Sequence, residues 1–326
     1  TGVYPGRHGI TGNEWFDRTL DASEPFSRRT REYIKYGDED DPGLGRAWSF
    51  GGIPIHDMDL SPQVRTIYEA FEEAEAKRGR EIRTAVVFDP VRRGADEVVN
   101  PDLYDALLSL DFLPFVDSFA RLDESAMVRA VDLIKSDDPP ELMGVWLPGL
   151  DGWSHAHGPG PVGKAEDRQA IYVVKNIDHL IGGLVQALEE RGLLDETVIM
   201  LASDHGQADT IGEDEFAIDA EKVYRALAGS PYRPPLDEDG DLDEDSTDFD
   251  VAVMANSNGN AALFSIRTPG TDWNRPPKRA DLEAVSALMV NEHYVSRIFF
   301  LEQGEHGEES VVFMISPGDV GPTAVR

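Results

Sequence analysis

Short apolar runs alternate with amphipathic segments along much of the chain, and this alternation constrains the fold more than any other feature of the sequence. Three runs have the length of buried strands: 84–88, 142–147 and 197–202. Three other segments have apolar residues at helical spacing: 61–79, 123–135 and 165–191. Strand, helix and strand in this order predict right-handed crossovers and a mainly parallel central sheet flanked by helices. We therefore expect an α/β fold.

The ends of these segments carry typical signals. Ser61 can cap the first helix, Pro62 suits its first position, and Gly79 can end it. Gly192 can end the long third helix. The chemistry of open parallel sheets lies beyond the carboxyl ends of their strands, so the residues after each run are the first candidates for a site.

The character of the sequence changes near residue 209. Residues 251–267 and 294–316 have the composition of strands, and a helix is expected near 280–291. We predict a core over residues 1–208 and an accessory, strand-rich α+β lobe over residues 209–326 that can return to the core. The acidic stretch 237–250 lacks the ordered ligand pattern of a calcium loop, which favours a solvated loop.

The chain is strongly acidic, with 62 Asp and Glu against 30 Lys and Arg and a net charge of −32. Such a field repels nucleic acid and anionic membranes, so a nucleic-acid scaffold role is disfavoured. Bound cations would still allow an anionic substrate. No cysteine is present, so any metal must be held by His and carboxylate side chains. No apolar run is long enough to span a membrane, and no leader is recognisable.

Two clusters of acidic and histidine residues follow predicted strands. Asp151 and His155 can turn a carboxylate and an imidazole toward one cation, on a segment where Gly152, Gly158 and Pro159 favour a loop. Spacing alone also fits a structural role for this pair, and His157 is the weaker candidate because it fits a surface position.

The second cluster, Asp204 and His205, stands immediately after the run that ends at Ala202, and Gly206 allows the backbone to turn away. One crossover would place the two clusters side by side at the sheet edge. Two cations held there can clamp the attacking and leaving oxygens of a phosphoryl displacement.

The opening, residues 1–15, is by composition a glycine-rich turn. It resembles the stretch after the nucleophile in type I phosphodiesterases/nucleotide pyrophosphatases and in the phosphate-irrepressible alkaline phosphatases, both of the alkaline phosphatase superfamily. Residues 151–159 resemble the Asp-x-x-Gly-His-x-x-Gly-Pro motif of these families, with Ser154 in place of a glycine, and residues 203–206 match their Ser-Asp-His-Gly. Three motifs in the right order make the resemblance specific at the level of the superfamily.

The resemblance implies an alkaline-phosphatase-like catalytic core that hydrolyses phosphate esters or nucleotide pyrophosphates with two zinc ions. Asp151 and His155 would hold one zinc, and Asp204 and His205 the other. Asn13 would donate a hydrogen bond to a phosphate oxygen of a small phosphate ester or nucleotide substrate, whereas His8 is structural. A periplasmic or secreted location is implied as well.

The resemblance places the nucleophile, a Thr or Ser that forms a phospho-enzyme, upstream of Thr1, together with the first metal-binding Asp. It places a last zinc-binding His beyond the end of the chain. His306 imitates that motif, but the apolar runs on both sides of it favour a charged hairpin turn. We therefore expect a catalytically incomplete fragment whose core lacks parts at both ends.

Arg93 fits the arginine of a Lys-x-Arg pair that grips the terminal phosphate in irrepressible alkaline phosphatases, but Val91 stands where the lysine would be. A guanidinium suits phosphate oxygens, so Arg93 is a candidate substrate contact. The missing lysine favours diesters over monoesters. Two alternatives stay open: a phosphomutase or sulfatase on the same fold, and a non-catalytic binding domain.

Overall fold

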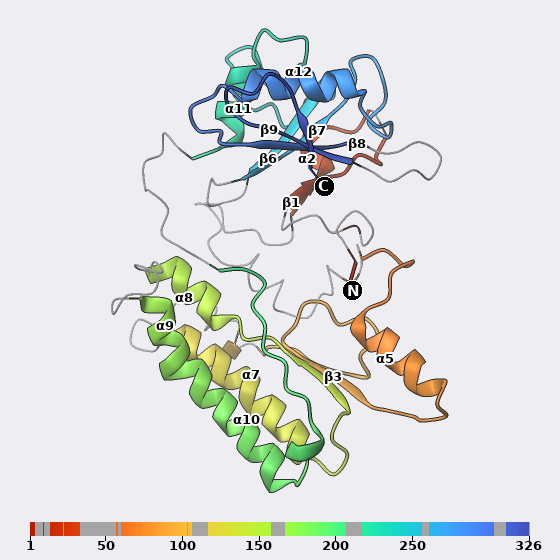
Figure 1. The fold of residues 1–326 in the computed structure, drawn as a ribbon, viewed down its shortest axis with the longest axis vertical. Coiled ribbons are helices and arrows are strands. Elements are labelled where there is room, and N and C mark those ends of the chain that lie inside the picture. Colours follow the sequence, from red (N-terminus) through yellow and green to blue (C-terminus); the bar gives the residue numbers. More distant parts are fainter. Residues whose placement is uncertain are drawn as a thin grey trace. The chain divides into compact units, whose positions relative to one another are not determined.

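The computed structural model describes residues 1–3, 9, 14–21, 23–32, 57, 60–102, 104–105, 117–157, 167–206, 217–255, 261–302 and 311–325. The chain divides into two compact units, shown in Figure 1. Unit 1 consists of Thr1–Thr11 and Tyr33–Thr210, and unit 2 of Gly12–Glu32 and Ile211–Arg326. The sequence-based division between residues 208 and 209 assigned residues 12–32 to the core, whereas the structure groups them with unit 2.

Unit 1 contains the expected parallel sheet. Its strands are β3 (Thr84–Val87), β4 (Glu97–Val99) and β5 (Leu142–Val145), in the order β4-β3-β5, and both pairs are parallel. The central strand β3 is buried along its whole length, as an apolar strand covered on both faces should be. This arrangement confirms the predicted α/β class.

Helices cover the two faces of this sheet. Helix α7 (Ser118–Lys135) packs through Leu122, Ala126 and Ala130 against Ala85 and Val87 of β3. On the other face, the hydroxyl of Tyr68 in α5 (Ile67–Ala76) lies against Gly144, the partner of Val86 in the register of β3 and β5.

The long helix expected over 165–191 is present as a continuous series. It consists of α9 (Arg168–Tyr172), the π-helical turn η1 (Val173–Ile177) and α10 (Asp178–Glu190), and the short 3-10 helix η2 (Leu194–Glu196) follows. Ile134 of α7 packs with Ala187 and Leu188 of α10. The two helices therefore run side by side (Figure 1).

The first predicted helix begins later than its sequence signals indicated. Thr66, and not Ser61, is the N-cap of α5, because its hydroxyl accepts from the backbone N–H of Glu69 while the Glu69 carboxylate accepts from the N–H of Thr66. Ser61 instead begins a turn, in which its carbonyl accepts from the N–H of Val64. Two reciprocal hydrogen bonds outcompete a single potential cap.

The strand predicted over 197–202 is absent from the sheet. This segment has no regular secondary structure and pairs with no strand among the described residues. Its side chains are exposed: Val198 by 85%, Met200 by 89% and Leu201 by 72%. An apolar run predicts extended backbone, but a strand also requires a neighbour that accepts and donates its hydrogen bonds. That requirement cannot be read from the run itself.

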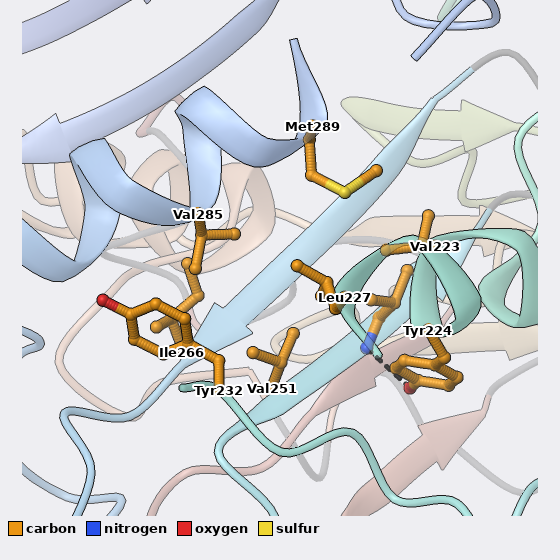
Figure 2. Packing of buried hydrophobic residues seen from close by; sticks show 9 residues of the cluster. Val223, Tyr224, Leu227, Tyr232, Val251, Ile266, Val285 and Met289 are labelled. Carbon is orange, nitrogen blue, oxygen red and sulfur yellow. Dashed lines mark hydrogen bonds between the residues drawn. The ribbon is translucent and has the colours of Figure 1, made fainter. Parts of the chain in front are cut away.

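The described residues of unit 2 form antiparallel sheets and helices. The helices are α2 (Phe26–Arg29), α11 (Ala220–Leu227) and α12 (Arg279–Met289). The strands pair as β1 (Glu14–Phe16) with β2 (Thr30–Glu32), β6 (Val251–Ala255) with β7 (Ala262–Ile266), and β8 (Ile298–Glu302), β9 (Val311–Ile315) and β10 (Thr323–Val325) in the order β10-β9-β8. Figure 2 shows side chains of α11, α12, β6 and β7 meeting in the main core of this unit.

Aromatic packing explains why residues 14–32 belong to unit 2. Phe16 and Phe26 are buried together with Phe249 and Trp273, with ring centroids 4.6 Å apart between Phe16 and Trp273. The guanidinium of Arg18 donates to the carbonyl oxygens of Trp273 and Ile266 at 3.1 and 2.9 Å.

The acidic stretch uses its carboxylates within the protein. Asp237 accepts from the backbone N–H groups of Asp239 and Asp241, which forms a tight turn. Asp250 is completely buried and accepts from the guanidinium groups of Arg233 and Arg267 at 2.8 and 2.9 Å.

None of the helices in the described part of the chain combines the length and apolar character needed to cross a membrane.

Candidate metal centre

The first acidic-histidine pair lies on helix α8 (Gly149–His157), which begins four residues after the carboxyl end of β5. The sequence predicts a loop here because of its glycines, and that prediction was wrong. Gly152 lies where α8 crosses Phe119 of α7, and a Cβ at this position would stand 2.5 Å from the Phe119 ring. The glycine therefore permits a close helix crossing and does not break the helix.

Asp151 and His155 face the same side of α8, because residues four apart are neighbours on a helix surface. His155 Nε2 lies 3.3 Å from Asp151 Oδ1, and the two side chains are 30% and 57% exposed. The pair thus presents one carboxylate and one imidazole to solvent. Both are ligand types that zinc accepts.

The second pair follows the apolar segment 197–202. His205 Nε2 lies 3.4 Å from Asp204 Oδ2, and the side chains are 67% and 86% exposed. The backbone here turns tightly, since Asp204 Oδ1 accepts from the N–H of His205 at 3.0 Å and the hydroxyl of Ser203 donates to the carbonyl of His205. This pair also offers one carboxylate and one imidazole.

The structure brings together the two members of each pair. Among the described residues, however, no group of three or more His, Cys, Asp and Glu side chains is arranged to hold a metal ion, so the two pairs do not form one such group. A protein zinc site usually has three or four protein ligands. The donor chemistry of each pair fits zinc and supplies part of a ligand set, and the expected convergence of Asp151 with Asp204 stays a prediction.

A buried carboxylate that sequence reasoning missed lies beneath α8. Asp123 of α7 is completely buried, and its carboxylate accepts from the backbone N–H of Gly149 at 2.7 Å and from the hydroxyl of Tyr172 at 2.9 Å. Burial raises the pKa of Asp123 to about 6, although these two donors oppose the shift. A charged residue on the apolar face of a helix, next to Leu122 and between Phe119 and Ala126, was the available signal.

His157 is occupied away from the pair. Its ring stacks on that of Trp153 with centroids 4.9 Å apart, and its Nδ1 lies 3.0 Å from the Trp153 carbonyl oxygen. Trp153 in turn packs on Tyr172, at 5.3 Å between ring centroids. His157 therefore belongs to the packing between α8 and α9, consistent with its rank as the weaker ligand candidate.

The backbone at the carboxyl end of β3 is strained. Phe88, directly after the strand, has φ 65°, which a bulky residue rarely adopts. The next residue, Asp89, has a raised pKa, because it is mostly buried and because Asp57 adds a second negative charge; the N–H of Val91 opposes the shift. Strain and a perturbed carboxyl mark this edge of the sheet as a candidate for function.

A sequence profile of the type I phosphodiesterase/nucleotide pyrophosphatase family matches residues 1–278. The chain belongs to this family. The family is part of the alkaline phosphatase superfamily, so the resemblance drawn from the three motifs is confirmed.

Several curated relatives carry the family name. The chain is 27% identical over 249 residues to ectonucleotide pyrophosphatase/phosphodiesterase 2 of Saccharomyces cerevisiae. The matched region covers 74% of this chain and 43% of the relative. It is 24% identical over 206 residues to ectonucleotide pyrophosphatase/phosphodiesterase family member 1 of Rattus norvegicus. Here the matched region covers 63% of this chain and 18% of the relative. The chain thus spans less than half the length of these relatives. No solved structure matches it.

Arg93, which the sequence analysis predicts as a phosphate contact, is engaged within the protein. Its Nε donates to Glu69 at 3.0 Å, and its Nη1 donates to the carbonyl oxygens of Leu60 and Ser61 at 3.0 and 3.3 Å. Its Nη2 donates to the Val64 carbonyl and to Glu69. All five guanidinium N–H groups can be accounted for by these acceptors. A phosphate would have to displace some of them.

Three other residues from the sequence analysis, His8, Asn13 and His306, lie outside the described residues. Their predicted roles, a structural histidine, a phosphate contact and a hairpin turn, stay predictions.

Proposed function

We propose that the protein is a metal-dependent hydrolase of phosphoric esters. It acts as a phosphodiesterase/nucleotide pyrophosphatase or, as the second candidate, a phosphomonoesterase. The observation that carries this proposal is the Asp151–His155 pair on α8, directly beyond the carboxyl end of β5, in a chain of this family. Ligand sites of open α/β sheets lie at this end of the strands. The relatives' names also support nucleotide pyrophosphates and phosphodiesters as the substrate class.

We assign two zinc ions to the site. Asp151 and His155 are proposed ligands of one ion, and Asp204 and His205 of the other. Bound zinc would activate an attacking oxygen and stabilise the charge on a leaving oxygen. The solvent exposure of both pairs leaves their donor atoms accessible to a cation, and the remaining ligands would have to come from residues other than these four.

The proposed reaction proceeds through a phospho-enzyme. A Thr or Ser hydroxyl, which we expect upstream of Thr1, forms a bond to phosphorus as the ester bond breaks and the alcohol or nucleotide leaves. Water then hydrolyses the phospho-enzyme and releases phosphate or a phosphate monoester. Within this sequence we propose no catalytic nucleophile, and Thr1 is not a candidate.

Asn13 and Arg93 are the proposed contacts to the phosphate group. For Arg93 this role requires a rearrangement, because Glu69 and three backbone carbonyls hold its guanidinium. The side chain is 23% exposed, so an approach from solvent is open.

Hydrolysis of bis(p-nitrophenyl) phosphate by the full-length protein tests the activity. We expect turnover that a chelator abolishes and added zinc restores, and we expect His155→Ala to lower the zinc content. His179→Ala is the matched control, because His179 is an exposed histidine on α10 of the same unit. Unchanged zinc stoichiometry in His155→Ala would refute the ligand role, and activity that resists complete zinc removal would refute the metal dependence.

A further inference from the structure

The carboxylate of Asp123 holds the first turn of the helix that carries the metal-ligand pair. Its Oδ1 accepts from the N–H of Gly149, the first residue of α8, at 2.7 Å. This N–H has no partner within its own helix, so a side chain of α7 supplies the acceptor that a helix start requires. Tyr172 of α9 donates to the other carboxylate oxygen at 2.9 Å. One buried carboxylate therefore links three helices.

Within the described part of the chain, no cation forms an ion pair with Asp123. Burial raises the pKa of Asp123 most, and the neighbouring carboxylate of Asp117 raises it further. The hydrogen bonds from Gly149 and Tyr172 lower it. Burying a carboxylate without a cation costs free energy, and hydrogen bonds to the carboxylate offset part of that cost. The positive end of the α8 dipole, to which the Gly149 N–H belongs, is its remaining source of stabilisation.

The surroundings leave α8 little freedom to rotate or slide. A Cβ on Gly149 would stand 2.5 Å from Asp123 Oδ2, and one on Gly152 would stand 2.5 Å from the Phe119 ring. On the side toward α9, the Gln169 amide donates to the hydroxyl of the buried Ser154 at 3.2 Å. Rotation of α8 would break the hydrogen bond to Asp123 and drive its backbone into α7.

The direction in which α8 presents Asp151 and His155 is therefore set by contacts on its opposite, buried side. We propose that Asp123 is a positioning residue, which fixes α8 so that Asp151 and His155 present their ligand atoms together to one cation. This inference rests on the proposed function, since it concerns the same metal site. The hydrogen bonds of Asp123 go to Gly149 and Tyr172, not to the side chains of the pair.

Metal affinity measured on the full-length protein tests the inference. Co²⁺ serves as the probe in competition with a chromophoric chelator, and hydrogen exchange reports the backbone protection of α8. Asp123→Ala removes both hydrogen bonds, and we expect the affinity for Co²⁺ to fall by about 10- to 100-fold, the range for groups that orient metal ligands. Faster exchange should appear in α8 and in α9, which Tyr172 ties to Asp123, and should not spread to the rest of unit 1. The separate variant Asp123→Asn keeps an acceptor for Gly149, so its Co²⁺ affinity should lie within about threefold of the wild type.

Leu133→Ala is the control for a general loss of stability. Leu133 lies in the core at the other end of α7 and contributes to the same helix-to-sheet packing. It should lower the stability of unit 1 and leave the Co²⁺ affinity unchanged. Equal affinities in the wild type and Asp123→Ala, or an equal loss in Leu133→Ala, would overturn the positioning role alone. A wild-type protein that binds no Co²⁺ would overturn the metal site and this inference together.

Discussion

The hydroxyl of Tyr172 donates a 2.9 Å hydrogen bond to the buried carboxylate of Asp123, across 49 residues of sequence. The pKa of Tyr172 is raised, mainly by burial and further by the charge of Asp123 and this hydrogen bond. It joins α9 to α7 directly below the helix that carries Asp151 and His155. Substitutions that weaken this junction should therefore also lower the metal affinity of the proposed site.

Asp123 should make the stability of unit 1 depend on pH. Its pKa is raised from 3.8 to about 6, so between these values the folded state binds more protons than the unfolded state and the free energy of unfolding falls as pH rises. The shift from 3.8 to about 6 corresponds to roughly 3 kcal/mol. Above the folded-state pKa, the free energy of unfolding is lower by this full amount. Asp123→Asn removes this penalty.

Urea denaturation of the wild type and Asp123→Asn on both sides of this window checks the prediction. The stability of the variant relative to the wild type should increase as pH rises from about 4 to about 7. A difference that is independent of pH would mean that the Asp123 carboxyl does not titrate in this range.

Tyr172→Phe removes one hydrogen bond to a charged, buried group and should lower the free energy of unfolding by about 2 kcal/mol. The Co²⁺ affinity should fall less than in Asp123→Ala, because Gly149 keeps its acceptor. Tyr224→Phe is matched to it, since the Tyr224 hydroxyl accepts from the N–H of Val253 at 2.9 Å in the core of unit 2 (Figure 2). That control should lose stability without any change in metal affinity.

Gly152→Ala should push α8 away from α7. The added Cβ would lie 2.5 Å from the Phe119 ring, which we expect to cost about 1–3 kcal/mol. Zinc content should fall in parallel. Gly183→Ala on α10 provides the contrast, because no heavy atom lies within 4 Å of the new Cβ. There the greater helix propensity of alanine should stabilise the protein by up to about 1 kcal/mol. Equal effects of the two substitutions would contradict the close crossing.

Arg93→Lys should lower the stability of unit 1 by about 2 kcal/mol, because one ammonium cannot replace a guanidinium that donates to four groups. Arg121→Lys, at an exposed ion pair with Glu124, should have little effect. Steady-state kinetics separate the two roles of Arg93. A raised KM would indicate a phosphate contact, whereas an unchanged KM together with lost stability would restrict Arg93 to a structural role.

Local patterns predicted the parallel sheet and most of its helices. The buried run at β3 and the apolar periodicity of residues 165–191 each depend on neighbours along the chain, and both predictions were confirmed in type and approximate extent. The run at 197–202 is similarly apolar but has no strand partner among the described residues. Pairing depends on a second segment, so the composition of one segment cannot predict it.

The glycines around Asp151 illustrate a different limit. Gly152 has the same identity whether it breaks a helix or allows one to cross another closely, and only the Phe119 ring beside it distinguishes the two. The same holds for Arg93, whose resemblance to a phosphate ligand says nothing about Glu69, 24 positions earlier in the chain.

The sequence by itself determined the family, the α/β class and the two acid–imidazole pairs, because motifs and periodicity are properties of contiguous residues. Only the tertiary structure decided that Asp151 and His155 share a helix, that Asp123 supports the start of that helix, and that residues 12–32 belong to unit 2. Each of these follows from side chains that are distant in the chain and meet in a close-packed interior. Such contacts depend on shape and burial, which no local pattern records.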